Sequence, residues 1–228
     1  MLKSSQMSKY LIPNKEEIKE LYWYPYYEMD HRHPSLYGNI FELLWQYYSS
    51  SNRYYHNINH IVSCHQQLDN YEEVEYKHPA FVRLAIWFHD VIYDTRQNNN
   101  EEMSVLLAKT LLSNNSTPEE IKCVNELILF TKHDKIAENG YEELISDIDL
   151  SILGTFESEY KKYSEAIRLE YGWVPDYMYY SQRLKILKKF YNKDNIFYTK
   201  YFRNSYESSA KVNLRNEIKE IEELLGES

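Results

Sequence analysis

The chain has 228 residues, 43% of them hydrophobic and 27% charged, which is the range of one globular domain with a sizeable core. Its formal net charge of −9 excludes a broad interface with the phosphate backbone of a nucleic acid, because that mode of binding needs clustered Lys and Arg. We therefore expect no extended nucleic-acid partner. A small phosphorylated ligand needs only a few local cations and stays compatible with this charge.

The sequence also argues against a membrane protein. No apolar run approaches the roughly 18 to 20 residues of a membrane span, and the first residues lack the apolar core of a signal peptide. Cys64 and Cys123 are then expected to be reduced thiols, so we predict a cytoplasmic protein without a membrane partner.

In chain order, residues 1–13 are expected to be a flexible lead-in, and residues 14–228 a single helical domain. Asn14, followed three residues later by Glu17, is typical of a helix start. Core helices are predicted over 36–48, from about His56 to Leu68, and over the very apolar run 80–88. The latter should lie in the middle of a bundle and carry the residues that follow it into the interior.

Further helices are predicted to start after the polar residues 94–100 and at Thr117-Pro118-Glu119-Glu120, which combines a cap, Pro at the first position and two acids. Others cover 141–148, the region before Tyr171 and the stretch after Pro175. The last segment, 207–225, alternates charges and should be a solvent-facing closing helix. No alternating strand pattern of useful length occurs, so the predicted fold class is all-α, a single-domain helical bundle.

Histidines and acids recur at the ends of these helices. His56 and His60 are four residues apart and would share a helix face, His89 adjoins Asp90 after the apolar run, and Asp147 and Asp149 come later. Imidazole and carboxylate ligands suit a divalent ion such as Mn, Mg, Ni, Fe or Zn, and four of them leave positions for water and substrate. The order His, His-Asp, Asp over separate helices thus favours a metal-dependent hydrolase.

These residues resemble the HD-domain metal-dependent phosphohydrolases, over roughly residues 40 to 220. The resemblance rests on the blocks Tyr55-His56-Asn57-x-x-His60, also similar to the signature of cyclic-nucleotide phosphodiesterases, Trp87-Phe88-His89-Asp90-x-x-Tyr93-Asp94, Asn100-Glu101-Glu102-x-Ser104, Thr131-Lys132-His133, Asp147-x-Asp149-Leu150-Ser151 and Ile167-Arg168-x-Glu170-Tyr171. It implies an all-α HD-type bundle that hydrolyses a phosphoester bond.

The resemblance implies a role for each matching residue. The metal ligands would be His60, His89, Asp90 and Asp149. Asp147 stays an alternative to Asp149. His56 would donate a proton to the leaving oxygen, although Arg53-x-x-His56 also allows His56 to be the first ligand.

Other residues are expected around the substrate. Glu101 and Lys132 are candidates for the catalytic groups, with Glu101 as a base or as support for a ligand. Arg53, Arg168 and Arg183 would contact phosphate. His133 would do the same or bind a second ion.

Some positions depart from the family pattern. Asn99 stands where an acid is expected, Asp134 where a second histidine often follows, and Lys211 where Arg is usual, which leaves the ligands intact and affects substrate contacts. The sequence thus predicts a phosphomonoesterase or phosphodiesterase acting on a small, nucleotide-like substrate. Two rival hypotheses are an HD-type di-iron oxygenase and a non-catalytic nucleotide-sensing module. The oligomeric state is open, a homodimer included.

Overall fold

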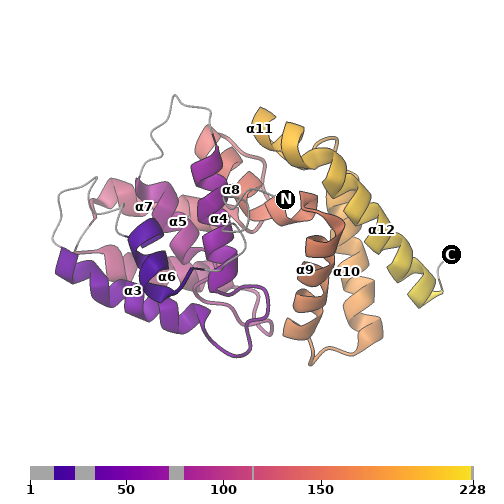
Figure 1. Cartoon of the computed structure of the whole chain (residues 1–228), viewed down its shortest axis with the longest axis horizontal. Helices are drawn as coiled ribbons and strands as arrows, with labels where there is room; N and C mark the ends of the chain where they lie inside the picture. The colour runs from indigo at the N-terminus through magenta and orange to yellow at the C-terminus, as the bar shows by residue number, and fades with distance from the viewer. Residues whose placement is uncertain (1–12, 24–33, 72–79, 115, 227–228) are drawn as a thin grey trace, which may run out of the picture.

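The computed structural model describes residues 13–23, 34–71, 80–114 and 116–226, so the expected lead-in falls almost wholly outside the described residues. Every regular element in the described part is helical, which confirms the all-α prediction there (Figure 1). The elements are α1 (Lys15–Ile18), η2 (Lys19–Trp23), α3 (Pro34–Tyr48), α4 (Ile58–Asn70), α5 (Ala80–Phe88), α6 (Asn100–Leu112), α7 (Pro118–Phe130), α8 (Gly140–Leu150), η3 (Ser151–Gly154), α9 (Glu157–Glu170), α10 (Asp176–Tyr191), α11 (Lys200–Phe202), η4 (Arg203–Glu207) and α12 (Ser208–Leu225).

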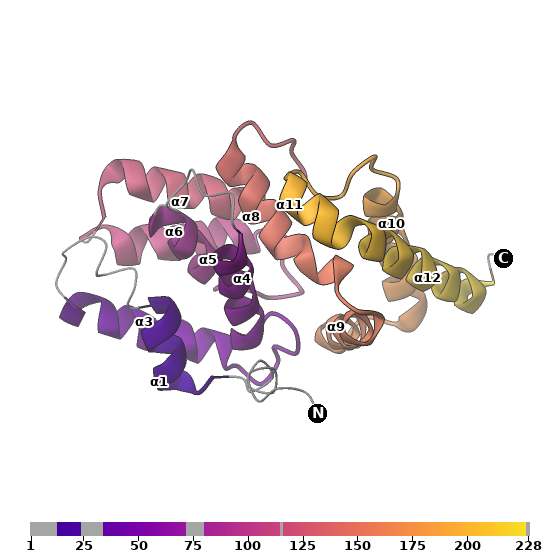
Figure 2. The same ribbon diagram turned by 45° about the horizontal axis from the view of Figure 1, so that its top comes forward.

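The helices form two groups along the long axis of the molecule. Helices α3 to α7 lie on one side and α9, α10 and α12 on the other, as Figures 1 and 2 both show. In the first group α7 packs against α5 and α6, and in the second α10 packs along α12. Helix α8 and the short η3 connect the two groups, so the end of α8 is held between them. The single-domain boundary at 14–228 stays a prediction.

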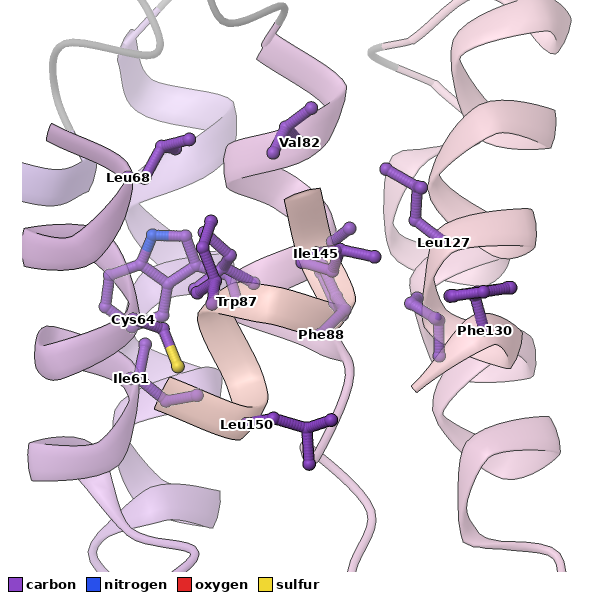
Figure 3. Close-up of a cluster of buried hydrophobic side chains, with 14 of the residues drawn as sticks. Ile61, Cys64, Leu68, Val82, Trp87, Phe88, Leu127, Phe130, Ile145 and Leu150 are labelled. Carbon is purple, nitrogen blue, oxygen red and sulfur yellow. The ribbon is translucent and has the colours of Figure 1, made fainter. Parts of the chain in front are cut away.

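Helix α5 lies at the centre of the first group, as its apolar sequence predicts. Trp87 and Phe88 are almost fully buried, and Figure 3 shows their side chains between those of α4, α7 and α8. The Trp87 indole donates to the carbonyl of Tyr22, and the Tyr48 hydroxyl donates to the carbonyl of Trp87. Burying an aromatic side chain of this kind contributes about 1.5–3 kcal/mol. The C-terminal end of α5, and the residues after it, are thereby fixed in the interior.

Two helix starts follow from local capping. Thr117 and Glu120 form a capping box at α7, as predicted, with Pro118 in the first turn. Helix α4 begins at Ile58, later than predicted, because extended Asn57 caps it by accepting the backbone N–H of Asn59. His56 therefore lies in the turn before α4, and the expectation that it shares a helix face with His60 is wrong.

Helix α12 is not the solvent-facing helix that its charges suggested. It packs against α10 and buries Ala210, Leu214, Ile218 and Ile221 on one face, while the i,i+4 pair of Lys219 and Glu223 lies on the exposed side. An alternation of charges reports on the outer face of a helix and does not exclude an apolar inner face.

Candidate metal centre

Four side chains from three separate places in the chain converge at the C-terminal end of α8. His60 comes from the first turn of α4, His89 and Asp90 follow α5, and Asp149 lies in the last turn of α8. One ligand atom from each of the four residues lies within 4.8 Å of all the others. We call these residues the His/Asp group. It comprises the four residues that the sequence predicts as ligands.

The distances within the group are short. His60 Nε2 lies 3.1 Å from His89 Nε2 and 3.3 Å from Asp149 Oδ1. Oδ2 of Asp90 lies 2.9 Å from His89 Nε2 and 3.4 Å from His60 Nε2. The imidazoles are 2% exposed, whereas the carboxylates of Asp90 and Asp149 are 16% and 20% exposed. Solvent therefore reaches the group from its carboxylate side.

The donor set fits a divalent cation. His89 Nδ1 donates to the carbonyl of Ile86 at 2.9 Å, which leaves the lone pair of a neutral ring on Nε2, directed at the rest of the group. Two imidazole nitrogens 3.1 Å apart and two carboxylates that face them are close enough together to bind one cation. Mixed nitrogen and carboxylate ligands are those preferred by ions of intermediate softness.

The charges of the group respond to its burial and its close neighbours. Burial alone would lower the pKa of His89, but Asp90 and Asp149 outweigh it and hold that pKa well above its usual value. Burial alone would raise the pKa of Asp149, but hydrogen bonds from His133 and both imidazoles of the group hold it well below its usual value. The two carboxylates are thus stabilised as anions inside the protein, the state in which they bind a cation.

His133 supports the His/Asp group through a hydrogen bond to one of its carboxylates. Its Nε2 donates to Asp149 Oδ2 at 2.8 Å, and the Ser146 hydroxyl lies 3.3 Å from its Nδ1. Its φ of 53° is in the left-handed region, which few residues other than glycine adopt. This conformation directs the imidazole at Asp149. The expected contact of His133 with phosphate or a second ion stays a prediction, and what the structure places there is a hydrogen bond to a ligand residue.

His56 lies next to the group and is held by a residue that the sequence did not single out. Its Nδ1 donates to Glu170 Oε2 at 2.7 Å, and Glu170 Oε1 accepts the backbone N–H groups of Tyr55 and His56. The Tyr93 ring stacks on the imidazole with centroids 3.9 Å apart. Of the two alternatives for the first ligand, the structure therefore places His60 in the group and His56 beside it. Glu170 belongs to the motif Ile167-Arg168-x-Glu170-Tyr171, but that motif assigned it no role.

Asp147 has a different function from Asp149. Its carboxylate is fully buried and accepts the backbone N–H groups of Tyr198 and Thr199, both at 2.7 Å. Burial raises its pKa to about 6, although the two backbone hydrogen bonds oppose the shift. Asp147 thus anchors the segment before α11, and the alternative ligand assignment receives no support.

Three of the predicted phosphate-binding cations are engaged with protein groups instead. The Arg53 guanidinium donates to the carbonyls of His56, Asp90 and Val91, and so ties the turn before α4 to the end of α5. Arg168 donates to the carbonyls of Tyr171 and Val174 and pairs with Asp176, which closes the turn between α9 and α10.

Arg183 is also bound to a protein group. It is 7% exposed and forms a double hydrogen bond with Glu217 of α12. The rings of Tyr163 and Tyr55 lie in succession between this guanidinium and His60. The physical reason is the packing of α10 on α12, which buries both charges and requires each to neutralise the other.

The two predicted catalytic residues come from the first turn of α6 and from the residues that follow α7. Lys132 forms an ion pair with Glu102. Glu101 is half-buried, and burial raises its pKa, with the negative charge of Asp90 adding to the effect. Among the described residues Glu101 has no hydrogen bond to the His/Asp group, so its catalytic role stays a prediction.

No family model, curated protein or solved structure matches the chain. In the described part of the chain, no helix has both the length and the apolarity to cross a bilayer. The helical fold and its His/Asp group are compatible with an HD domain, and the residues that support this are His60, His89, Asp90 and Asp149.

Proposed function

We propose that this protein is an HD-type metal-dependent phosphohydrolase that cleaves a phosphoester bond in a small, nucleotide-like substrate. The observation that supports it is the convergence of the His/Asp group, with two imidazoles and two carboxylates within 4.8 Å of one another. A divalent ion bound there would supply Lewis-acid chemistry, which lowers the pKa of water and neutralises charge on a phosphoryl oxygen.

The residues around the group have separate roles in the proposed reaction. His56 donates a proton to the leaving oxygen from Nε2, because Glu170 already holds Nδ1 as a donor at 2.7 Å. The Tyr93 ring stacked on it limits the orientations of the imidazole. Arg53 fixes both His56 and Asp90 through their backbone carbonyls, so proton donor and metal ligand keep their spacing.

The test is a substrate screen with a matched pair of variants. Purified protein is supplied with Mn, Mg, Ni, Fe or Zn and assayed against phosphomonoesters, cyclic nucleotides and nucleoside triphosphates. Asp90→Asn keeps the shape of the side chain and removes its charge, so we expect loss of metal binding and of all turnover. Asp69→Asn, at a surface ion pair with Arg83, should retain both.

The same screen separates the rival functions. Two bound irons without phosphatase activity would replace the proposal by an HD-type oxygenase. Tight nucleotide binding that persists in Asp90→Asn, with no turnover in either protein, would favour a sensing module.

A further inference from the structure

A basic cavity of about 480 Å³ lies beside the His/Asp group, on the side of His133. It is formed by the connection between α7 and α8, the C-terminal end of α10 and the segment leading into η4. Its charged lining comprises the cations Lys135, Lys189, Lys193 and Arg203 and the acids Asp134 and Asp194. The lining thus carries two more positive than negative charges, in a chain whose net charge is −9.

These cations are less fully neutralised by carboxylates than the predicted phosphate-binding cations are. Lys189 Nζ donates to the backbone carbonyl of His133 at 3.0 Å, which is a neutral partner. Lys193 is partly buried and lies over the Phe190 ring, with Nζ 5.2 Å from the centroid. Burial, followed by repulsion from Lys189, lowers the pKa of Lys193. A partly desolvated ammonium group beside a second one is stabilised by an anion placed between them.

The segment 193–203 forms one wall of this cavity. Asp147 binds the backbone of Tyr198 and Thr199, so the wall that carries Tyr198 is anchored to α8, two residues from Asp149. Within the described residues Lys193 and Arg203 form no ion pair, although Asp194 lies beside them in the lining and the buried carboxylate of Asp147 attracts Lys193. Two cationic side chains therefore remain free for an external anion.

His133 joins the cavity to the His/Asp group. The same residue lines the cavity, donates to Asp149 Oδ2 and receives Lys189 on its carbonyl. An anion in the cavity is thus one residue away from a proposed metal ligand.

We infer that this cavity binds a second anionic group of the substrate, a phosphate in the first instance, so that the preferred substrate carries one phosphoester for cleavage and another phosphate for recognition. The identity of the ligand as substrate rests on the proposed function. Anion binding by the cavity does not.

The experiment uses a double variant, Lys193→Gln with Arg203→Gln, and a charge-matched control, Lys185→Gln with Arg215→Gln, which removes two exposed cations outside the cavity. Calorimetry with inorganic pyrophosphate, in the presence of a chelator, measures anion binding by the cavity without a metal ion. We expect the cavity variant to bind pyrophosphate about tenfold or more weakly than the control. Lys193→Arg, which retains the charge, should bind as the native chain does.

Enzyme kinetics then test whether the anion that the cavity binds is part of the substrate. We expect the KM for adenosine 3′,5′-bisphosphate to rise about tenfold in the cavity variant, with little change for adenosine 5′-monophosphate. Equal pyrophosphate affinity in the cavity variant and its control would overturn the anion site. Weakened pyrophosphate binding with an unchanged ratio of the two KM values would overturn its role in substrate recognition. If no phosphoester is cleaved while the cavity variant still loses pyrophosphate, the proposed function fails and the anion site stands.

Discussion

Glu170 holds His56 by both of its oxygens. One oxygen accepts the imidazole Nδ1–H at 2.7 Å, and the other accepts the backbone N–H of His56 at 3.0 Å. Burial would raise the pKa of Glu170, but the hydrogen bond and charge of His56, together with the backbone N–H groups of Tyr55 and His56, outweigh it and keep that pKa below its usual value. A carboxylate from the second group of helices thus fixes the ring and backbone of a residue in the first.

Replacing Glu170 by Gln removes this charge while preserving the size of the side chain. We expect kcat to fall about 10- to 100-fold, because His56 loses its fixed orientation, with little change in metal affinity. A pH–rate profile should change shape as well, which a purely structural effect on stability would not produce. Glu165→Gln, at an exposed position of α9, is the control. An unaltered profile in Glu170→Gln would remove His56 from the mechanism.

His133→Asn tests the support of Asp149. Asn tolerates the left-handed backbone better than most residues, so this substitution isolates loss of the imidazole from backbone strain at φ 53°. We expect metal affinity to weaken about 10- to 100-fold, the usual effect of removing a residue that orients a ligand. Titration with Mn measures it, and Asp134→Asn should bind Mn as tightly as the native chain. Native affinity in His133→Asn would mean that Asp149 is oriented without it.

Much of the candidate site could be predicted from local patterns. The apolar run before His89 indicates burial, and the spacing of His60, His89, Asp90 and Asp149 over separate helices favours a shared site. The capping box at Thr117 likewise depends on residues three apart. Each of these signals lies within one stretch of chain, where periodicity and capping rules operate.

The parts of the site that were missed depend on contacts between distant residues. Glu170 is 114 residues from His56, and no local pattern reports that pairing. Arg183 and Glu217 both look like surface charges until α10 packs on α12. The basic cavity, with Lys193 among its cations, is assembled from three segments and has no motif of its own.

A substitution at Gly154 tests the close packing of η3 on η4. A Cβ atom at this position would lie 2.5 Å from the Tyr206 carbonyl oxygen and 2.8 Å from its Cα. Backbone atoms cannot move aside as a flexible side chain does, so we expect Gly154→Ala to lower the free energy of unfolding by about 1–3 kcal/mol. Gly140→Ala is the matched control, because a Cβ there meets nothing within 4 Å. It should raise stability by about 0.4–1 kcal/mol.

Urea denaturation of the two glycine variants gives the comparison directly. Opposite signs for the two alanines are the expected result. Equal stability of Gly154→Ala and the native chain would mean that η3 and η4 separate easily.

The buried His65 side chain leads to a prediction of how the free energy of unfolding depends on pH. Its side chain is fully buried between Tyr22 and Trp87, and neither ring nitrogen has a hydrogen-bond partner among the described residues. Burial, with smaller contributions from the charges of Arg83 and His89, lowers its pKa well below the usual value. The folded state therefore keeps this imidazole neutral. The unfolded state binds a proton more readily, so its contribution to stability is complete above the unfolded pKa of about 6.5 and declines as the pH falls below it.

The native chain and a His65→Phe variant share all their other titrating groups. The difference between the pH dependences of their unfolding free energies therefore reports on His65 alone. Between pH 7.5 and pH 5.5 we expect the native chain to lose about 1.4 kcal/mol more unfolding free energy than His65→Phe, from protonation of the unfolded state alone. Urea denaturation at both pH values measures the two losses. His65→Gln, which also lacks a titrating group but keeps polarity, should follow the Phe variant in its pH dependence while being less stable at both pH values, since it buries an amide without partners. Identical pH dependence of the native chain and both variants would show that the His65 ring takes up a proton equally in the folded and unfolded states.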